Sequence, residues 1–130
     1  MVVARVMLTV KEGTQRGRKF VLDRSAHWVI GRMDDCSLKL SGGIEYQLIS
    51  RHHAALDVEP RGVLVRDLGS LNGTYVNGKL VGRRHPGLAR EGATEVLDLG
   101  YPLADGDELR LGPVTFDVHV ELPANSPQNN

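Results

Sequence analysis

The sequence predicts an all-β fold, an antiparallel β-sandwich, from three observations. Short apolar and β-branched runs recur along the chain, with turn residues between them. No window shows the sustained helical periodicity and capping residues of an amphipathic helix. Apolar residues alternate with other residues in the later runs, as in strands that bury one face between two sheets. The alternation predicts five core residues, Val63, Val65, Val114, Phe116 and Val118.

The first half of the chain contains five predicted strands. Val2–Val10 is rich in apolar and β-branched residues and ends at the polar residues 11–13. Three shorter strands are predicted at Lys19–Leu22, Trp28–Ile30 and Leu38–Leu40. A long glycine-containing loop is expected at 41–49, before a strand at Ala54–Val58.

Four strands follow, at Val63–Leu68, Thr74–Val76, Glu108–Leu111 and Val114–Leu122. The first follows the turn residues 59–62, and the second ends at Asn77-Gly78, a dipeptide that tolerates the positive φ of a hairpin turn. Residues 82–102 contain prolines and glycines and show weak periodicity, and 95–99 are a candidate for an extra strand.

Composition points to one globular domain that is not a general nucleic-acid binder. The 130 residues include 16 basic and 16 acidic side chains, so the basic excess of a nucleic-acid-binding protein is absent. Cys36 is the single cysteine, so no internal disulfide is expected. No apolar stretch approaches the roughly 20 residues of a membrane helix, and the N-terminus does not resemble a signal peptide. We therefore expect a cytoplasmic protein without a membrane partner.

Polar clusters at the strand ends supply the groups that bind a phosphate. Arg32 has a planar guanidinium that stays charged and matches the oxygens of a phosphothreonine dianion. Ser50 offers a compact hydroxyl, and Arg51 adds a second cation beside it. Taken alone, each has an ordinary alternative, a solvated arginine or a turn serine.

A second group of residues is suited to hold an extended peptide. The amide of Asn72 both donates and accepts, so it can pair with a peptide backbone, and Gly73 permits a tight turn beside it. Asn77 is mainly a hairpin residue, with ligand binding as the minority interpretation. His53 opens a strand, and we expect it to link two loops by hydrogen bonds rather than to activate Ser50 as a nucleophile.

The sequence predicts no enzyme, cofactor or metal site. There is no P-loop and no G-x-G-x-x-G motif. The cysteine and the histidines, Cys36, His52, His53 and His85, lack the spacing of zinc ligands. Asp105-Gly106-Asp107 is too short for a calcium loop and is expected to form a turn.

The order and spacing of five segments resemble the forkhead-associated (FHA) domain family over about Trp28–Val118. The segments are Ile30-Gly31-Arg32, Cys36–Leu40, Ser50-Arg51-His52-His53, Asp67–Gly78 and Leu103–Gly112. The resemblance implies an FHA/SMAD-like sandwich of about eleven strands that binds phosphothreonine peptides through loops at one end. It implies a partner that is a phosphothreonine protein, such as a Ser/Thr kinase or its substrate.

The resemblance also assigns residue roles. The implied peptide-binding residues are Arg32, Ser50, Arg51, Leu71, Asn72, Thr74 and Asn77. Gly31, His53, Gly73 and Gly78 are implied to shape the site. The FHA domain is expected at 1–122, with a flexible polar tail at 123–130.

Departures from the family pattern leave alternatives open. The loop before Ser50 and the segment at about 82–102 look longer than usual. Leu71 stands where some family members have a polar residue that contacts phosphothreonine, which leaves the threonine preference open. A phosphate-independent interaction domain that docks a partner through 82–102 is therefore the rival hypothesis. A small hydrolase built on Ser50 and His53 is a weaker one.

Overall fold

The computed structural model describes residues 4–84 and 100–123, which form two packed β-sheets. The first sheet has six strands in the order β2-β1-β11-β10-β7-β8. Its strands are β1 (Arg5–Val10), β2 (Lys19–Leu22), β7 (Thr74–Val76), β8 (Lys79–Gly82), β10 (Glu108–Leu111) and β11 (Val114–Glu121). The predicted all-β sandwich of about eleven strands is confirmed.

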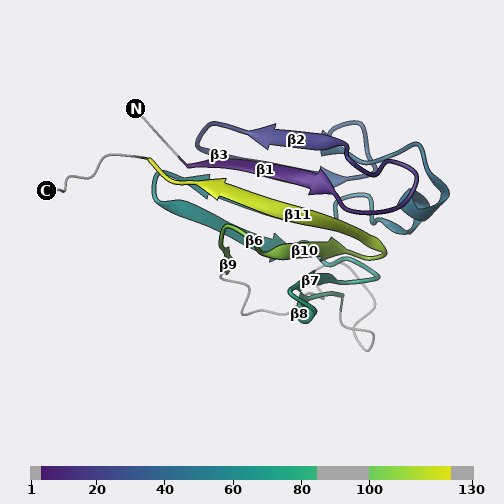
Figure 1. The fold of residues 1–130 in the computed structure, drawn as a ribbon. Coiled ribbons are helices and arrows are strands. Elements are labelled where there is room, and N and C mark those ends of the chain that lie inside the picture. The colour runs from purple at the N-terminus through teal and green to yellow at the C-terminus, as the bar shows by residue number, and fades with distance from the viewer. Residues whose placement is uncertain (1–3, 85–99, 124–130) are drawn as a thin grey trace, which may run out of the picture.

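The second sheet has five strands in the order β4-β3-β5-β6-β9. Its strands are β3 (Ala26–Gly31), β4 (Leu38–Lys39), β5 (Ala54–Glu59), β6 (Gly62–Asp67) and β9 (Tyr101–Leu103). The β3–β4 pairing is parallel, whereas the other pairings in both sheets are antiparallel. The two sheets lie face to face in Figure 1.

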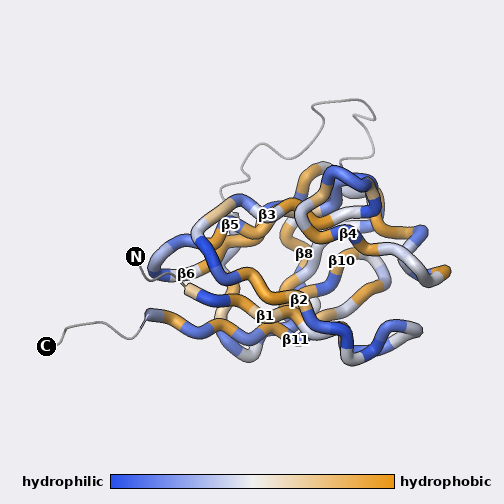
Figure 2. Tube along the Cα trace, turned by 90° about the horizontal axis from the view of Figure 1, so that it is seen from above, coloured by the Kyte–Doolittle hydropathy of each residue, from blue (hydrophilic) through white to orange (hydrophobic). Residues whose placement is uncertain are grey.

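The core lies between the sheets and follows the predicted alternation. All five predicted core residues are buried, and Phe116 is 0% exposed. Phe20 packs edge-on against Phe116, with ring centroids 6.3 Å apart. Figure 2 shows apolar stretches along the strands and hydrophilic stretches at the turns.

Two strands and one short helix were not predicted from the sequence. β8 and β9 lie at the edges of their sheets, and β9 contains Pro102, a residue that sheets accept mainly at an edge. The expected loop at 41–49 contains the 3₁₀ helix η1 (Ile44–Leu48), anchored by the buried ring of Tyr46. The candidate strand at 95–99 lies outside the described residues. The described residues include no helix that is long and apolar enough to cross a membrane.

One end of the sandwich gathers the loops that carry the candidate binding residues. β3 and β6 run toward the same end, and the β3–β4, β4–β5 and β6–β7 connections meet there (Figure 1). β1 begins and β11 ends at the opposite end. Residues that are far apart in the sequence therefore share one surface.

Candidate functional site

Arg32 lies where the β3–β4 loop meets the loop before β5. Its backbone N–H donates to the carbonyl of Ser50 at 3.2 Å, and the backbone N–H of Met33 donates to the carbonyl of Arg51 at 3.3 Å. Its side-chain Nε donates to the carbonyl of Ile49, and the residue is exposed. The terminal guanidinium nitrogens are bonded to no other described residue, so they remain open to an anion beside Ser50.

Ser50 joins this surface to the β6–β7 loop. Its hydroxyl accepts a hydrogen bond from the backbone N–H of Leu71 at 3.0 Å. A hydroxyl that accepts in this way keeps its own proton free to donate to a ligand. Ser50 is only partly exposed, whereas its neighbour Arg51 is exposed at the rim.

His53 connects the same two loops from beneath the surface. Its Nδ1 accepts a hydrogen bond from the backbone N–H of Ser50 at 3.1 Å, and its Nε2 donates to the carbonyl of Gly73 at 2.8 Å. This pattern requires the neutral ring with the proton on Nε2. The side chain is 0% exposed, and burial lowers the pKa of His53. The His53 ring accepts its hydrogen bond from the backbone N–H of Ser50 and not from the Ser50 hydroxyl, so Ser50 and His53 do not form a nucleophile–base pair.

The β6–β7 loop is organised by the buried carboxylate of Asp67. One carboxylate oxygen accepts the backbone N–H groups of Gly69 and Ser70, each at 2.9 Å. The other accepts the hydroxyls of Ser70 and Thr74. The Ser70 hydroxyl in turn accepts the N–H of Gly73 at 3.0 Å. This network fixes the short turn that presents Leu71 and Asn72.

Asn72 and Leu71 stand on the exposed side of that turn. The Asn72 amide donates to the carbonyl of Leu48 at 2.9 Å, which ties the β6–β7 loop to η1. The amide oxygen faces no described partner. Leu71 is 64% exposed, and Leu48 is 55% exposed. The turn therefore offers a polar backbone-binding group next to apolar surface.

Close backbone contact explains why glycine stands at 31. A Cβ placed on Gly31 would lie 2.0 Å from the carbonyl oxygen of Arg51, much closer than any real contact. Gly73 has a different requirement, because its φ of 91° lies in the left-handed region that favours glycine. Gly78 has the same requirement in the β7–β8 hairpin, with a φ of 83°.

Two of the candidate peptide-binding residues do not reach this surface. Thr74 is 0% exposed, and its hydroxyl is used by Asp67. Asn77 sits in the β7–β8 turn with a φ of 51°, and its amide donates to Asp107 at 3.0 Å and accepts from Glu108 at 2.9 Å. The residues brought together at the rim are Arg32, Ser50, Arg51, Leu71 and Asn72.

The family assignment follows from a match across this whole unit. The family model described as FHA domain matches residues 28–112, from within β3 to the residue after β10. The chain belongs to the FHA domain family. This confirms the resemblance found in the sequence, and the five rim residues all lie within the matched segment of the FHA domain.

The relatives of this FHA domain include two bacterial regulators. The glycogen accumulation regulator GarA of Mycobacterium tuberculosis is 35% identical over 106 residues, which are 82% of this chain and 52% of GarA. The oxoglutarate dehydrogenase inhibitor of Corynebacterium diphtheriae is 39% identical over 117 residues, 90% of this chain and 66% of that protein. The chain thus spans only about half the length of GarA.

Solved structures show the same domain. An FHA domain studied for phosphothreonine-dependent interactions has a TM-score of 0.66 and 29% identity, and the match covers 92% of this chain and 98% of that one. The FHA domain of CT664 from Chlamydia trachomatis has a TM-score of 0.66 and 26% identity, covering 88% of this chain and 96% of the other.

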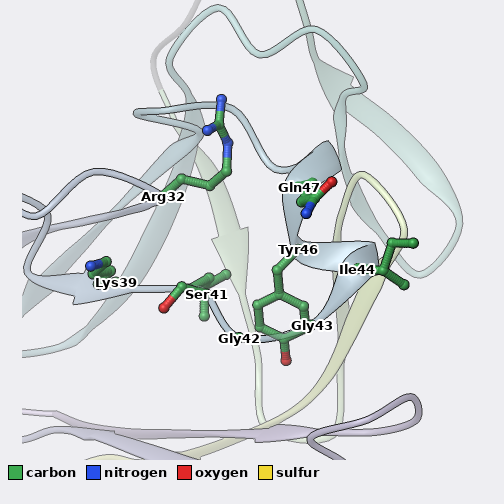
Figure 3. Close-up of a pocket in the computed structure, with 9 residues that line it drawn as sticks. Arg32, Lys39, Ser41, Gly42, Gly43, Ile44, Tyr46 and Gln47 are labelled. Atoms are coloured by element: carbon green, nitrogen blue, oxygen red, sulfur yellow. The ribbon is translucent and has the colours of Figure 1, made fainter.

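The FHA domain has an open pocket beside Arg32 that the sequence did not reveal. The pocket has a volume of about 590 Å³, and its lining includes Lys39, Ser41 and Gln47. Figure 3 shows Arg32 and Lys39 on one side and η1, with the lining residues Ile44, Tyr46 and Gln47, on the other. Through Arg32, the pocket adjoins the rim surface that carries Ser50 and Asn72.

Sequence reasoning also missed the roles of Asp67 and Ser70. An aspartate just before Gly69-Ser70 is a recognisable turn signal, because its carboxylate can accept backbone N–H groups two and three residues on. The pocket residues Lys39 and Gln47 carried no such signal.

The structure brings together one further set of side chains that sequence spacing separated. Ligand-type atoms of Asp35, Cys36 and His52 all lie within 4.8 Å of one another. The sequence-based expectation of no metal site rested on spacing along the chain. Spacing does not describe this cluster, because two loops contribute to it.

Proposed function

We propose that this FHA domain binds phosphothreonine-containing peptides or proteins, as a module of Ser/Thr kinase signalling. One observation carries the proposal: the Arg32 guanidinium and the Ser50 hydroxyl lie on loops that are hydrogen-bonded to each other at the rim of the sandwich. The solved FHA domain with phosphothreonine-dependent interactions, 29% identical to this chain, supports the same ligand class. The partner is a phosphorylated protein such as a kinase or its substrate.

Charge and geometry suit these two residues to a phosphate. A phosphothreonine carries close to two negative charges and three acceptor oxygens. The Nε of Arg32 is held by the carbonyl of Ile49, so the side chain is oriented before the ligand arrives and loses little freedom on binding. Ser50 donates its hydroxyl proton to a second phosphate oxygen, and Arg51 adds positive charge at the rim.

The remaining rim residues position the peptide. Asn72 is already fixed by its bond to Leu48, and its amide oxygen is free to accept a peptide N–H. Leu71 lies beside it and offers apolar contact to the threonine methyl group. The side chains of Thr74 and Asn77 support the loops rather than the ligand in this proposal.

The role is that of a binding module and not of an enzyme. His53 is engaged with Ser50 N–H and Gly73 carbonyl, so it is not available as a general base. Cytoplasmic residence is part of the proposal and rests on the sequence, which has a single cysteine.

Isothermal titration with one phosphothreonine peptide and its unphosphorylated counterpart tests the proposal, the peptide being chosen from an oriented phosphothreonine library. We expect binding of the phosphorylated peptide only, and Arg32→Ala should weaken it by roughly 2–5 kcal/mol, or about 30- to 5,000-fold. Arg5→Ala is the matched control, because Arg5 pairs with Glu121 at the opposite end of the sandwich.

Two outcomes would contradict the proposal. Equal affinity for both peptides would show that the phosphate is not recognised. Capture of a partner that is insensitive to phosphatase, but lost on deleting 85–99 from the 82–102 segment, would favour the phosphate-independent domain, because this deletion leaves strands β8 and β9 in place. Most of that segment, 85–99, lies outside the described residues.

A further inference from the structure

The cluster of Asp35, Cys36 and His52 is the strongest feature that peptide binding leaves unexplained. Asp35 and Cys36 lie in the β3–β4 loop, and His52 lies in the turn just before β5. His52 Nε2 is 3.0 and 3.1 Å from the two carboxylate oxygens of Asp35. Together with the sulfur of Cys36, these ligand-type atoms all lie within 4.8 Å of one another.

The chemistry of this set matches a zinc ion. Zinc in proteins takes thiolate sulfur at about 2.3 Å and imidazole nitrogen at about 2.0–2.1 Å, which places tetrahedral ligands roughly 3–4 Å apart. Ligand atoms that already lie within 4.8 Å therefore need to move by about 1 Å or less each. A sulfur, an imidazole nitrogen and a carboxylate oxygen are three of the donor types that zinc prefers, whereas calcium and magnesium prefer oxygen alone.

We propose that Asp35, Cys36 and His52 bind a zinc ion at the flank of the peptide-binding surface. Zinc binding replaces the S–H bond of Cys36 with an S–Zn bond, and the thiol proton leaves to solvent. Three protein ligands leave the fourth position to a water molecule or to a group from a partner. The inference does not depend on the proposed function, because it concerns different side chains.

The site would join the two loops that carry the phosphate-binding candidates. Cys36 Sγ lies 3.2 Å from the carbonyl oxygen of Arg51 and donates to it in the absence of metal. Arg51 directly precedes His52, and Met33 N–H donates to the same Arg51 carbonyl. A zinc ion here would fasten the β3–β4 loop to the Ser50–His53 turn through side chains other than those of the His53 ring bonds.

Other histidines provide an internal comparison. His27 pairs with Asp57, and His119 pairs with Asp105 at 2.7 Å and Glu121 at 3.1 Å. These pairs resemble the His52–Asp35 pair but contain no sulfur. The Cys36 thiol therefore distinguishes the proposed site from the other histidine–carboxylate pairs of the described residues.

The test is a titration of ZnCl₂ into the full chain, without added histidine tags and after treatment with a chelator. We expect a single tight equivalent, and substitution with cobalt should give a sulfur-to-cobalt charge-transfer band. Outer-shell substitutions cost about 10–100-fold in metal affinity, so loss of a direct ligand in Cys36→Ser or His52→Gln should cost at least about 100-fold. Serine keeps a donor for the Arg51 carbonyl, so the fold should survive.

His119→Gln is the matched control and should leave zinc affinity unchanged. The proposal is overturned if the unmodified chain binds no zinc, if Cys36→Ser binds it as tightly, or if the cobalt spectrum lacks the thiolate band. Asp35→Asn, at an exposed position, serves as the third ligand variant if either of the others fails to fold. Phosphopeptide titration of the same zinc-free samples reports separately on the proposed function.

Discussion

Replacing Asp67 with asparagine is predicted to be one of the most destabilising single changes in this domain. The buried carboxylate accepts four hydrogen bonds: from the N–H groups of Gly69 and Ser70 on one oxygen, and from the hydroxyls of Ser70 and Thr74 on the other. Asparagine has nearly the same shape but presents an NH₂ group in place of one oxygen. If the NH₂ group faces the N–H groups of Gly69 and Ser70, two donors face a donor. If it faces the Ser70 and Thr74 hydroxyls, these must turn round and accept, and in either orientation the charged acceptor is lost.

The magnitude follows from the loss of the charged acceptor at four bonds. A hydrogen bond to a charged group contributes about 1.5–3 kcal/mol and a neutral one about 0.5–1.5 kcal/mol, so a loss of about 1 kcal/mol at each bond amounts to roughly 4 kcal/mol. A domain of this size has a total stability of about 5–15 kcal/mol, so the loss is a large fraction of it. The turn that presents Leu71 and Asn72 would also lose its fixed geometry, so phosphopeptide affinity should fall even where the domain remains folded.

Urea unfolding followed by circular dichroism measures this loss as a drop in the midpoint at unchanged slope. Asp117→Asn is the control, because Asp117 is exposed on β11, and it should change stability by less than about 0.5 kcal/mol. A loss below about 1 kcal/mol for Asp67→Asn would refute the reasoning, because it would mean that the four bonds contribute little.

Three further predictions follow from individual contacts. Burial lowers the pKa of His53 from its usual value of 6.5, so the unfolded chain takes up that proton at a higher pH than the folded domain does, and stability falls as the pH drops below about 6.5. Urea unfolding from pH 8 to 5 should show this loss of stability, and an equal loss in His53→Gln would contradict the prediction. Gly31→Ala places a Cβ 2.0 Å from the Arg51 carbonyl and should cost about 1–3 kcal/mol or more, whereas Gly62→Ala, with open space around it, should be near neutral in the same assay. If Leu71 contacts the threonine methyl group, calorimetry should show a phosphoserine peptide binding roughly fivefold more weakly than the matching phosphothreonine peptide. This difference should shrink in Leu71→Ala, and an unchanged ratio of the two affinities would show that Leu71 does not contact the methyl group.

The sequence by itself determined the fold class and most strands. Period-two alternation is a local property of the chain, so Val114, Phe116 and Val118 were identifiable as core before any coordinates. Asn77-Gly78 identified its hairpin for a similar reason, since positive φ is a property of the residue itself. The order of the polar segments was also enough to indicate the FHA family.

Tertiary structure decided which candidate side chains face a ligand and which face the protein. Thr74 lies on the inward face of β7 with Val76, and Asn77 turns toward Asp107, thirty residues away. Edge strand β9 depends on pairing with β6, because its own residues carry no strand pattern. The partners of His53 and the meeting of Cys36 with His52 likewise depend on loops from different strands. Contacts of this kind form only when the sheets pack, so no local pattern in the chain encodes them.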